Sequence, residues 1–303
     1  MPHLSTKCPV LLCFPIILAG AAPTRAQQAS YVVVFGVDGL SSRGIETAST
    51  PVIHGLMAHG MWTLDGRAVI PAVSSPNWAA MIMGAAPDVT GVTSNDWMPA
   101  KHEIVPSCDD GFGHSPTIFG LIRKTRPELK SALFTDWPDF SRLIEPSAVS
   151  HIFSKDGDAP EAVRQAIRYM IIQKPALTFI HVDHVDHAGH TFGWDTPEYL
   201  RAVEQGDELL GLVLRALDDS GMRSQSVLLV TADHGGHEKT HGAMIQKDIA
   251  IPWIAAGHGI MTGEIGVPVS TTQTAPTIAQ WLGLKPSECW ITRPVEFAPV
   301  RSH

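Results

Sequence analysis

The chain carries little charge, and its charge has the wrong sign for a protein that coats nucleic acid. Charged residues make up 17% of the sequence, and 30 acidic residues outnumber 22 basic ones. Nucleic-acid-coating proteins show the opposite balance, so we exclude that class. Hydrophobic residues make up 44%, enough for one large core, and no internal repeat or long linker divides the chain. We therefore expect residues 27–303 to form a single domain.

Long apolar runs are also missing, apart from one at the N-terminus. Lys7 precedes an apolar stretch over residues 8–22, and small residues lead to a cleavage site near residues 24–26. This stretch is too short, and too interrupted by proline, to make a good membrane span. We predict a signal peptide over residues 1–26 and a secreted or periplasmic protein with no stable membrane span after its removal. An uncleaved anchor is the alternative.

Cysteine is scarce. Cys8 and Cys13 lie in the predicted signal, which leaves Cys108 and Cys289 among the four cysteines of the chain. An oxidising compartment would allow these two to pair, but two unrelated buried thiols fit the sequence equally well. The sequence leaves both possibilities open.

Apolar runs alternate with amphipathic segments after the signal. This alternation predicts an α/β fold with a mostly parallel central sheet and helices on both faces. The expected strands are residues 31–37, 131–135, 177–182, 226–231 and 251–256. The expected helices follow Asp158 and Pro160, run over residues 197–217, and occupy a short stretch over residues 277–282.

Carboxylates follow three of the expected strands. Asp38, Asp186 and Asp233 each come soon after an apolar run. In an open α/β sheet, ligands bind beyond the carboxyl ends of the strands. The three segments should therefore bring their carboxylates to one edge of the sheet.

Histidine is abundant, at 15 residues, and several histidines stand beside aspartate. Asp233 and His234 are adjacent at a strand end, and Zn²⁺ accepts both ligand types. Asp186 and His190 are four residues apart, which places them on one side of a helical turn. We prefer this pair to the equally spaced Asp183 and His187, because Asp183 is still close to the strand.

A third ligand for the same metal must come from another segment. His241, which precedes Gly242, is our candidate, and His237 is the runner-up. The surplus histidines of the run, His181, His184 and His187, are more typical of residues that support ligands than of ligands themselves.

A hydroxyl group at a helix start completes the set. Pro76 fits the first turn of a helix, with Ser74 or Ser75 expected as its N-cap. A helix N-terminus attracts phosphate through its amides and its dipole. An N-cap serine without any catalytic role explains the same residues. The chain has no Gly-x-Ser-x-Gly elbow, so a serine-esterase triad is poorly supported.

Together these motifs resemble the alkaline phosphatase superfamily, specifically its type I phosphodiesterase/nucleotide pyrophosphatase branch. The resemblance extends from about residue 32 to residue 294. It rests on the segments Val37–Gly39, Thr50–Pro51, Pro71–Asn77, Asn95, Asp186–His190, Asp233–Gly235, His241–Gly242 and Ile251–Ile254. It implies an alkaline-phosphatase-like three-layer sandwich.

The resemblance also implies two Zn²⁺ sites, although other divalent metals would suit the same ligands. Asp186, His190 and His241 would hold one ion. Asp38, Asp233, His234 and the nucleophile Ser74 would hold the other. Asn95 matches the family asparagine that contacts a phosphoryl oxygen. Serine at position 74 departs from the threonine usual in this branch.

The expected function is zinc-dependent hydrolysis of a small phosphate ester or nucleotide, of the phosphodiester or nucleotide pyrophosphate type, through a phosphoseryl intermediate on Ser74. An alkaline phosphomonoesterase with the same two-metal site is the alternative within the class. A non-catalytic protein that binds zinc or phosphate is the alternative outside it. A sulfatase is disfavoured, because Ser74–Asn77 lacks the arginine of the Cys/Ser-x-Pro-x-Arg motif.

Overall fold

The computed structural model describes residues 28–101, 103–109 and 111–298. The predicted signal over residues 1–26 lies outside the described residues. Among the described helices, none is long and apolar enough to cross a membrane.

One eight-stranded sheet forms the centre of the molecule, in the order β4-β3-β5-β1-β6-β7-β2-β8. The strands from β4 to β6 all run parallel, while β7 lies antiparallel to both β6 and β2. The strands are β1 (Tyr31–Val37), β2 (Met61–Arg67), β3 (Ser131–Thr135), β4 (His151–Ser154), β5 (Leu177–Val182), β6 (Ser226–Thr231), β7 (Ala250–Gly257) and β8 (Gly263–Glu264).

All five expected strands are present, four of them with the predicted bounds. The fifth, expected over residues 251–256, is β7, and it reverses direction relative to the parallel strands. The sequence did not indicate β2, β4 or β8. Each lacks a continuous apolar run, because β4 is partly exposed, β2 alternates buried with less buried residues, and β8 has two residues.

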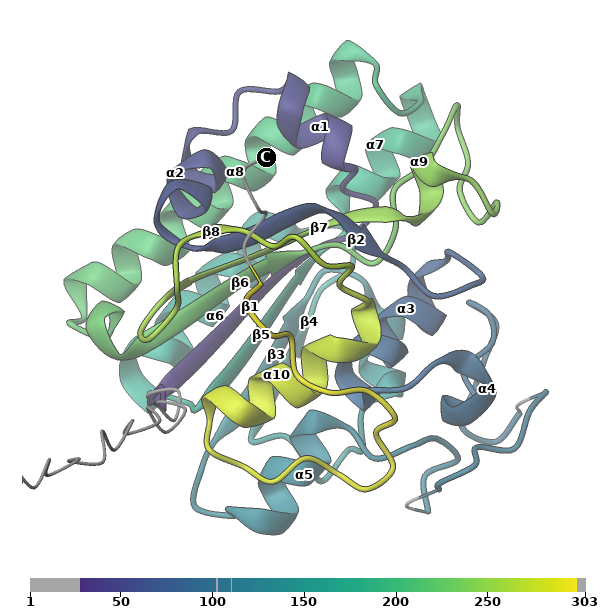
Figure 1. Cartoon of the computed structure of the whole chain (residues 1–303), viewed down its shortest axis with the longest axis vertical. Coiled ribbons are helices and arrows are strands. Elements are labelled where there is room, and N and C mark those ends of the chain that lie inside the picture. Colours follow the sequence, from purple (N-terminus) through teal and green to yellow (C-terminus); the bar gives the residue numbers. More distant parts are fainter. Residues whose placement is uncertain (1–27, 102, 110, 299–303) are drawn as a thin grey trace, which may run out of the picture.

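Helices cover both faces of the sheet (Figure 1). The layer that contains α2 and α8 is completed by α1, α6 and α7, and the opposite layer contains α3, α5 and α10. The helices are α1 (Ser42–Thr47), α2 (Pro51–His59), α3 (Ser74–Met83), α4 (Pro87–Thr90), α5 (Ile118–Thr125), α6 (Ala159–Gln173), α7 (His184–Phe192), α8 (Pro197–Asp219), α9 (Gln246–Ile249) and α10 (Thr274–Trp281), with 3-10 turns η1 (Pro138–Leu143), η2 (Arg223–Gln225) and η3 (Thr271–Gln273).

The apolar core is divided in two by the sheet, because successive side chains of a strand point to opposite faces. In β1, Val32 and Val34 pack into the layer of α3, α5 and α10, whereas Val33 and Phe35 pack into the layer of α2, α6 and α8. Strands buried on both faces read as continuous apolar runs. The predicted three-layer sandwich with a mostly parallel sheet is therefore confirmed.

The helix signals had a local physical basis. Asp158 caps α6, since its side chain accepts a hydrogen bond from the amide of Glu161. The helix expected over residues 277–282 begins earlier, at Thr274, because a capping box between Ser270 and Gln273 starts a 3-10 turn that leads directly into it.

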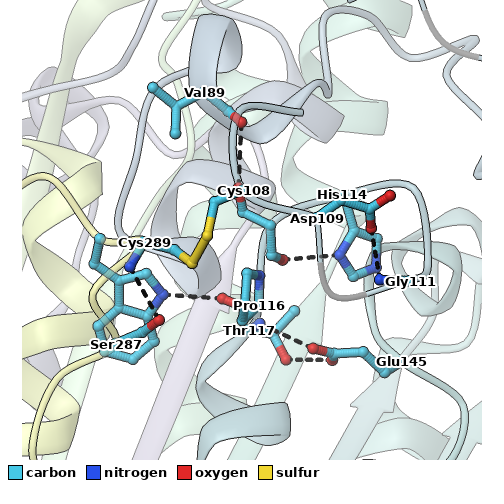
Figure 2. Close-up of a disulfide and its surroundings, with 12 residues drawn as sticks. Val89, Cys108, Asp109, Gly111, His114, Pro116, Thr117, Glu145, Ser287 and Cys289 are labelled. Carbon is cyan, nitrogen blue, oxygen red and sulfur yellow. Dashed lines mark hydrogen bonds between the residues drawn. A yellow bond between two sulfur atoms is a disulfide. The ribbon is translucent and has the colours of Figure 1, made fainter. Parts of the chain in front are cut away.

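The disulfide left open by the sequence is present. Cys108 and Cys289 are bonded, with 5.7 Å between their Cα atoms and a sequence separation of 181 residues. Figure 2 shows that the bond joins the C-terminal segment to the loop before α5, beside the pair in which Thr117 donates to the buried carboxylate of Glu145. The disulfide thus ties the loop that follows α4 to a segment near the C-terminus.

Candidate active site

The predicted carboxylates meet at one edge of the sheet. Asp38 follows β1, Asp233 and His234 follow β6, and Asp186 lies in the first turn of α7, directly after β5. Because β5, β1 and β6 are adjacent and parallel, their carboxyl ends deliver these side chains to the same place. Ser74, the first residue of α3, reaches the cluster from the other side.

Close approach of α7 to the end of β1 requires glycine at position 39. Gly39 has a φ of +66°, and a Cβ atom built there would lie 2.8 Å from Asp186 Oδ1. Gly189 of α7 also leaves no room for a side chain, because the ring of Trp194 would lie 2.6 Å from an added Cβ atom.

Asp38 is fully buried and held by two donors. Trp78 Nε1 donates to its Oδ2 over 2.9 Å, and His181 Nε2 donates to the same oxygen over 3.1 Å. The other oxygen, Oδ1, lies 3.4 Å from His234 Nε2 and 3.5 Å from Ser74 Oγ. One oxygen is therefore anchored and the other faces the site. His181 supports a candidate ligand, in the role expected for it.

Three histidines present the same ring nitrogen to the cluster. The Nδ1 atoms of His234, His241 and His190 lie 2.8, 3.0 and 3.0 Å from backbone carbonyl oxygens. A carbonyl can only accept, so each Nδ1 carries the proton and each Nε2 of a neutral ring carries a lone pair. This is the arrangement found behind histidine ligands of metals.

These lone pairs face carboxylate oxygens. His190 Nε2 lies 3.3 Å from Asp186 Oδ2, His241 Nε2 lies 3.9 Å from Asp186 Oδ1, and His234 Nε2 lies 3.1 Å from Asp233 Oδ2. Asp186 Oδ1 and Asp233 Oδ2 are buried and accept no hydrogen bond. Two acceptors facing each other across such distances attract only when a cation lies between them. The donor set fits a divalent metal.

The described residues contain two groups that could each hold a metal ion, and within each group the ligand atoms lie within 4.8 Å of one another. One contains Asp186, His190 and His241, as the resemblance implied. The other contains Asp38, His234 and again Asp186. Asp233 adjoins the second group through His234, and its Oδ1 accepts from the amide of Gly39 over 3.2 Å. Asp186 therefore stands between the two groups.

His237 is turned away from both groups. Its Nδ1 lies 2.7 Å from Asp248 Oδ1, and its backbone pairs with Thr240 in a short bridge. Asp248 is fully buried and also accepts from the amide of Ala243. The Asp248 contact holds the turn that carries His241. This geometry supports the choice of His241 over His237.

Burial and mutual repulsion set the charges of the cluster. Burial raises the pKa of Asp186 and of Asp233 well above the ordinary value, and the negative charge of Asp38 raises both further. Burial would also raise the pKa of Asp38, but the hydrogen bond from His181 and the proximity of His234 hold it well below its ordinary value. Burial lowers the pKa of His234 to about 3 and lowers that of His241. His234 and His241 are therefore neutral near pH 7, as metal ligands must be.

The start of α3 differs from the expectation. Neither Ser74 nor Ser75 is the N-cap, because the helix begins at Ser74 and its N-cap is Val73, which makes no side-chain cap. Asn95 takes over part of that task, since its Oδ1 accepts from the amide of Ser75 over 2.8 Å. Ser74 Oγ is thereby left to face the site, 3.3 Å from His234 Nε2.

Arg142 was missed by the sequence reasoning. It lies on η1, 47 residues beyond Asn95, and its Nη2 donates to the backbone carbonyl of Asn95 and, over 3.4 Å, to Ser75 Oγ. No spacing or motif connects these positions in the sequence. The nearest signal was the position of Arg142 shortly after the strand over residues 131–135.

Comparison with known proteins shows the family. A model of the type I phosphodiesterase/nucleotide pyrophosphatase family matches residues 32–251. The chain belongs to this family. The predicted family is therefore confirmed.

Curated relatives match about two thirds of this chain or slightly more. Ectonucleotide pyrophosphatase/phosphodiesterase family member 1 of Mus musculus is 22% identical over 214 residues, which cover 67% of this chain and 24% of the relative. A venom phosphodiesterase of Macrovipera lebetinus is 23% identical over 228 residues, covering 72% and 27%. The chain thus spans about a quarter of the length of these relatives.

Solved structures show the same fold over most of their length. Murine ectonucleotide pyrophosphatase/phosphodiesterase 5, as an inactive variant in complex with AMP, matches with a TM-score of 0.70 at 16% identity, covering 89% of this chain and 98% of that one. A protein in complex with its substrate D-glucosamine-2-N,6-O-disulfate also matches with a TM-score of 0.70, at 12% identity, covering 88% of this chain and 79% of that one. At such identities the likeness shows the fold alone.

The two histidines of the loop before α9 should differ in metal content. We expect His241→Ala to lose about one of two zinc ions, because its Nε2 faces Asp186. His237→Ala should retain both ions, since its ring contacts Asp248. Zinc per chain, measured by atomic emission on protein whose circular dichroism is unchanged, checks this. Zinc retained in His241→Ala but lost in His237→Ala would reverse the assignment.

The raised pKa values of Asp186 and Asp233 predict that zinc stabilises the protein more at pH 8 than at pH 5.5. In the metal-free protein, stability falls as the pH rises from the ordinary aspartate pKa of 3.8 through the raised pKa values, because the unfolded chain loses these protons first. Zinc would replace the protons on the two carboxylates. Zinc at 100 times its Kd raises the free energy of unfolding by about 2.7 kcal/mol. The rise in melting temperature with zinc, measured at both pH values, should be larger at pH 8; an equal or larger rise at pH 5.5 would contradict this.

Proposed function

We propose that the chain is a zinc-dependent hydrolase of phosphate esters, of the phosphodiester or nucleotide pyrophosphate type, with Ser74 as the nucleophile. The observation that carries the proposal is the position of Ser74 Oγ. It lies 3.3 Å from His234 Nε2 and 3.5 Å from Asp38 Oδ1, at the N-terminus of a helix and beside a donor set that fits divalent metal. A structural N-cap serine would direct this oxygen at its own helix.

The residues then divide the work. Asp186, His190 and His241 would hold one zinc ion, and Asp38, Asp233, His234 and Ser74 the other. Zinc bound there supplies the positive charge that lowers the pKa of a nearby hydroxyl and stabilises a leaving oxygen. Ser74 Oγ attacks phosphorus while its hydroxyl proton passes to solvent, the bond from phosphorus to the leaving oxygen breaks, and the leaving group takes a proton from water. Water then attacks the phosphoserine: the water oxygen bonds to phosphorus, the bond from phosphorus to Ser74 Oγ breaks, and a proton returns to Ser74.

Asn95 supplies a donor for the phosphoryl group. Its Oδ1 is engaged by the amide of Ser75, which leaves the two N–H groups of Nδ2 free of that contact. A fixed donor near an oxygen that gains charge in the transition state lowers the barrier. The hydrogen bond by which the Ser75 amide, in the first turn of α3, holds the Asn95 side chain supports this role.

The names of the relatives support a nucleotide-like substrate and export. The matched relatives are called phosphodiesterases and nucleotide pyrophosphatases, and one solved neighbour is in complex with AMP. The disulfide between Cys108 and Cys289 is typical of oxidising compartments and supports the predicted signal peptide and a secreted or periplasmic location. We propose that residues 27–303 act on a small phosphate ester or nucleotide.

The choice between diester and monoester is measured on one preparation. We expect a higher kcat/KM for bis-p-nitrophenyl phosphate than for p-nitrophenyl phosphate, because Asn95 is neutral and a dianionic monoester favours a cation in that place. A large preference for the monoester would make the protein an alkaline phosphomonoesterase. Hydrolysis of neither, by zinc-loaded protein, would leave only the non-catalytic alternative.

Adjacent serines provide a matched pair for the nucleophile. Ser74→Ala should lower kcat by at least about 10³-fold, since it removes the attacking oxygen. Ser75→Ala should cost far less, because its hydroxyl contacts Arg142 and not the site. Ser74→Thr should keep part of the activity. Kinetics with the diester, on variants of equal zinc content, check this, and a dead Ser75→Ala beside an active Ser74→Ala would place the nucleophile one residue later.

A further inference from the structure

Arg142 lies beside the site, and its guanidinium group contacts other residues of the protein. Nη2 donates to the carbonyl of Asn95 and lies 3.4 Å from Ser75 Oγ, while Nη1 lies 3.4 Å from Asp139 Oδ2. The side chain of Arg142 is 15% exposed, and its Nε is buried without a hydrogen-bond partner. An arginine in so much contact is a fixed group and not a mobile surface charge.

Asn95 needs such a group, because little else holds it. It is exposed, in a bend at residues 94–96 that belongs to no helix or strand. Two of its contacts fix it: Oδ1 accepts from the amide of Ser75, and the carbonyl accepts from Arg142. One contact holds the side chain and the other holds the backbone. Together they determine where Nδ2 points.

The turn that carries Arg142 is anchored in the core. Phe140, on the same turn, is fully buried and packs against Trp78, Phe179 and His181, with ring centroids 5.0 to 5.5 Å apart. Trp78 and His181 are the donors that hold Asp38. Arg142 therefore projects from the aromatic cluster that supports the nucleophile side of the site.

We propose that Arg142 is a positioning residue that acts through Asn95: by binding the Asn95 carbonyl it fixes the amide that contacts the phosphoryl group. The inference rests on the proposed function, because it assigns Asn95 to the substrate. A misplaced donor loses rate steeply, with roughly 10²-fold for a displacement of about 1 Å. Arg142 thus controls the phosphoryl contact without touching the substrate.

A double-mutant cycle on the zinc-loaded protein tests this. With bis-p-nitrophenyl phosphate, Arg142→Met should lower kcat/KM by roughly 10- to 100-fold. In an Asn95→Ala background the same change should cost less than about twofold, because the group it positions is gone. Arg142→Lys, which keeps one donor, should recover part of the loss. Arg164→Met is the matched control, since Arg164 also pairs with an acid three residues before it, Glu161, but on the surface of α6.

Phosphate binding provides a readout that does not need turnover. In zinc-loaded Ser74→Ala protein, Arg142→Met should raise the Kd of inorganic phosphate, as measured by calorimetry. When Asn95→Ala is also present, Arg142→Met should leave this Kd unchanged. A loss of kcat/KM that persists undiminished in the Asn95→Ala background overturns the inference, whether Arg142 then acts on the substrate charge or on the fold. A wild-type protein without hydrolysis overturns the proposed function instead. If Arg142→Met melts at a lower temperature than wild type, the same double-mutant cycle is measured with Arg142→Lys in place of Arg142→Met, and its result decides whether the inference holds.

Discussion

The site depends on the repulsion among three carboxylates at the end of the sheet. Asp38 and Asp233 are fully buried and Asp186 nearly so, and the two raised pKa values show how unfavourable three negative charges are in this place. Hydrogen bonds outweigh this cost for Asp38, whereas the amide of Gly39 offsets only part of it for Asp233. The remaining buried oxygens face imidazole lone pairs, so a proton or a metal ion must neutralise them. A fold that retains this arrangement stabilises it by binding cations.

The sheet can hold such a cluster because its ligands are fixed from behind. Each of the three histidines is locked by a carbonyl bound to Nδ1, and Asp38 is locked by Trp78 and His181. None of these contacts depends on a metal. The geometry is therefore present before a cation binds, and little side-chain freedom is lost on binding. Gly39 contributes in another way, since only a residue without Cβ allows α7 to approach β1 so closely.

Sequence reasoning recovered what is encoded locally. The strands that end near Asp38, Asp186 and Asp233 are buried on both faces, so they read as apolar runs, and the i,i+4 spacing of Asp186 and His190 identified a helix face. The exposed strand β4 and the alternating strand β2 lacked that signal. The direction of β7 was not visible either, because pairing is a property of the sheet and not of one strand. The contact between Arg142 and Asn95 is a tertiary one: Phe140, on the same turn as Arg142, packs against Trp78 of α3, and no local pattern encodes that packing.

The absence of a serine cap on α3 explains how one serine is left for chemistry. An N-cap hydroxyl accepts from an amide of its own helix and is thereby oriented away from other partners. Here Val73 occupies the cap position, and the amide of Ser75 is satisfied by Asn95 from a distant bend. The helix end is thus completed by the residue assigned to the phosphoryl group, and Ser74 Oγ keeps its lone pairs for the site. On the proposed roles, the hydrogen bond from the Ser75 amide to Asn95 connects the start of the nucleophile's helix with the phosphoryl donor.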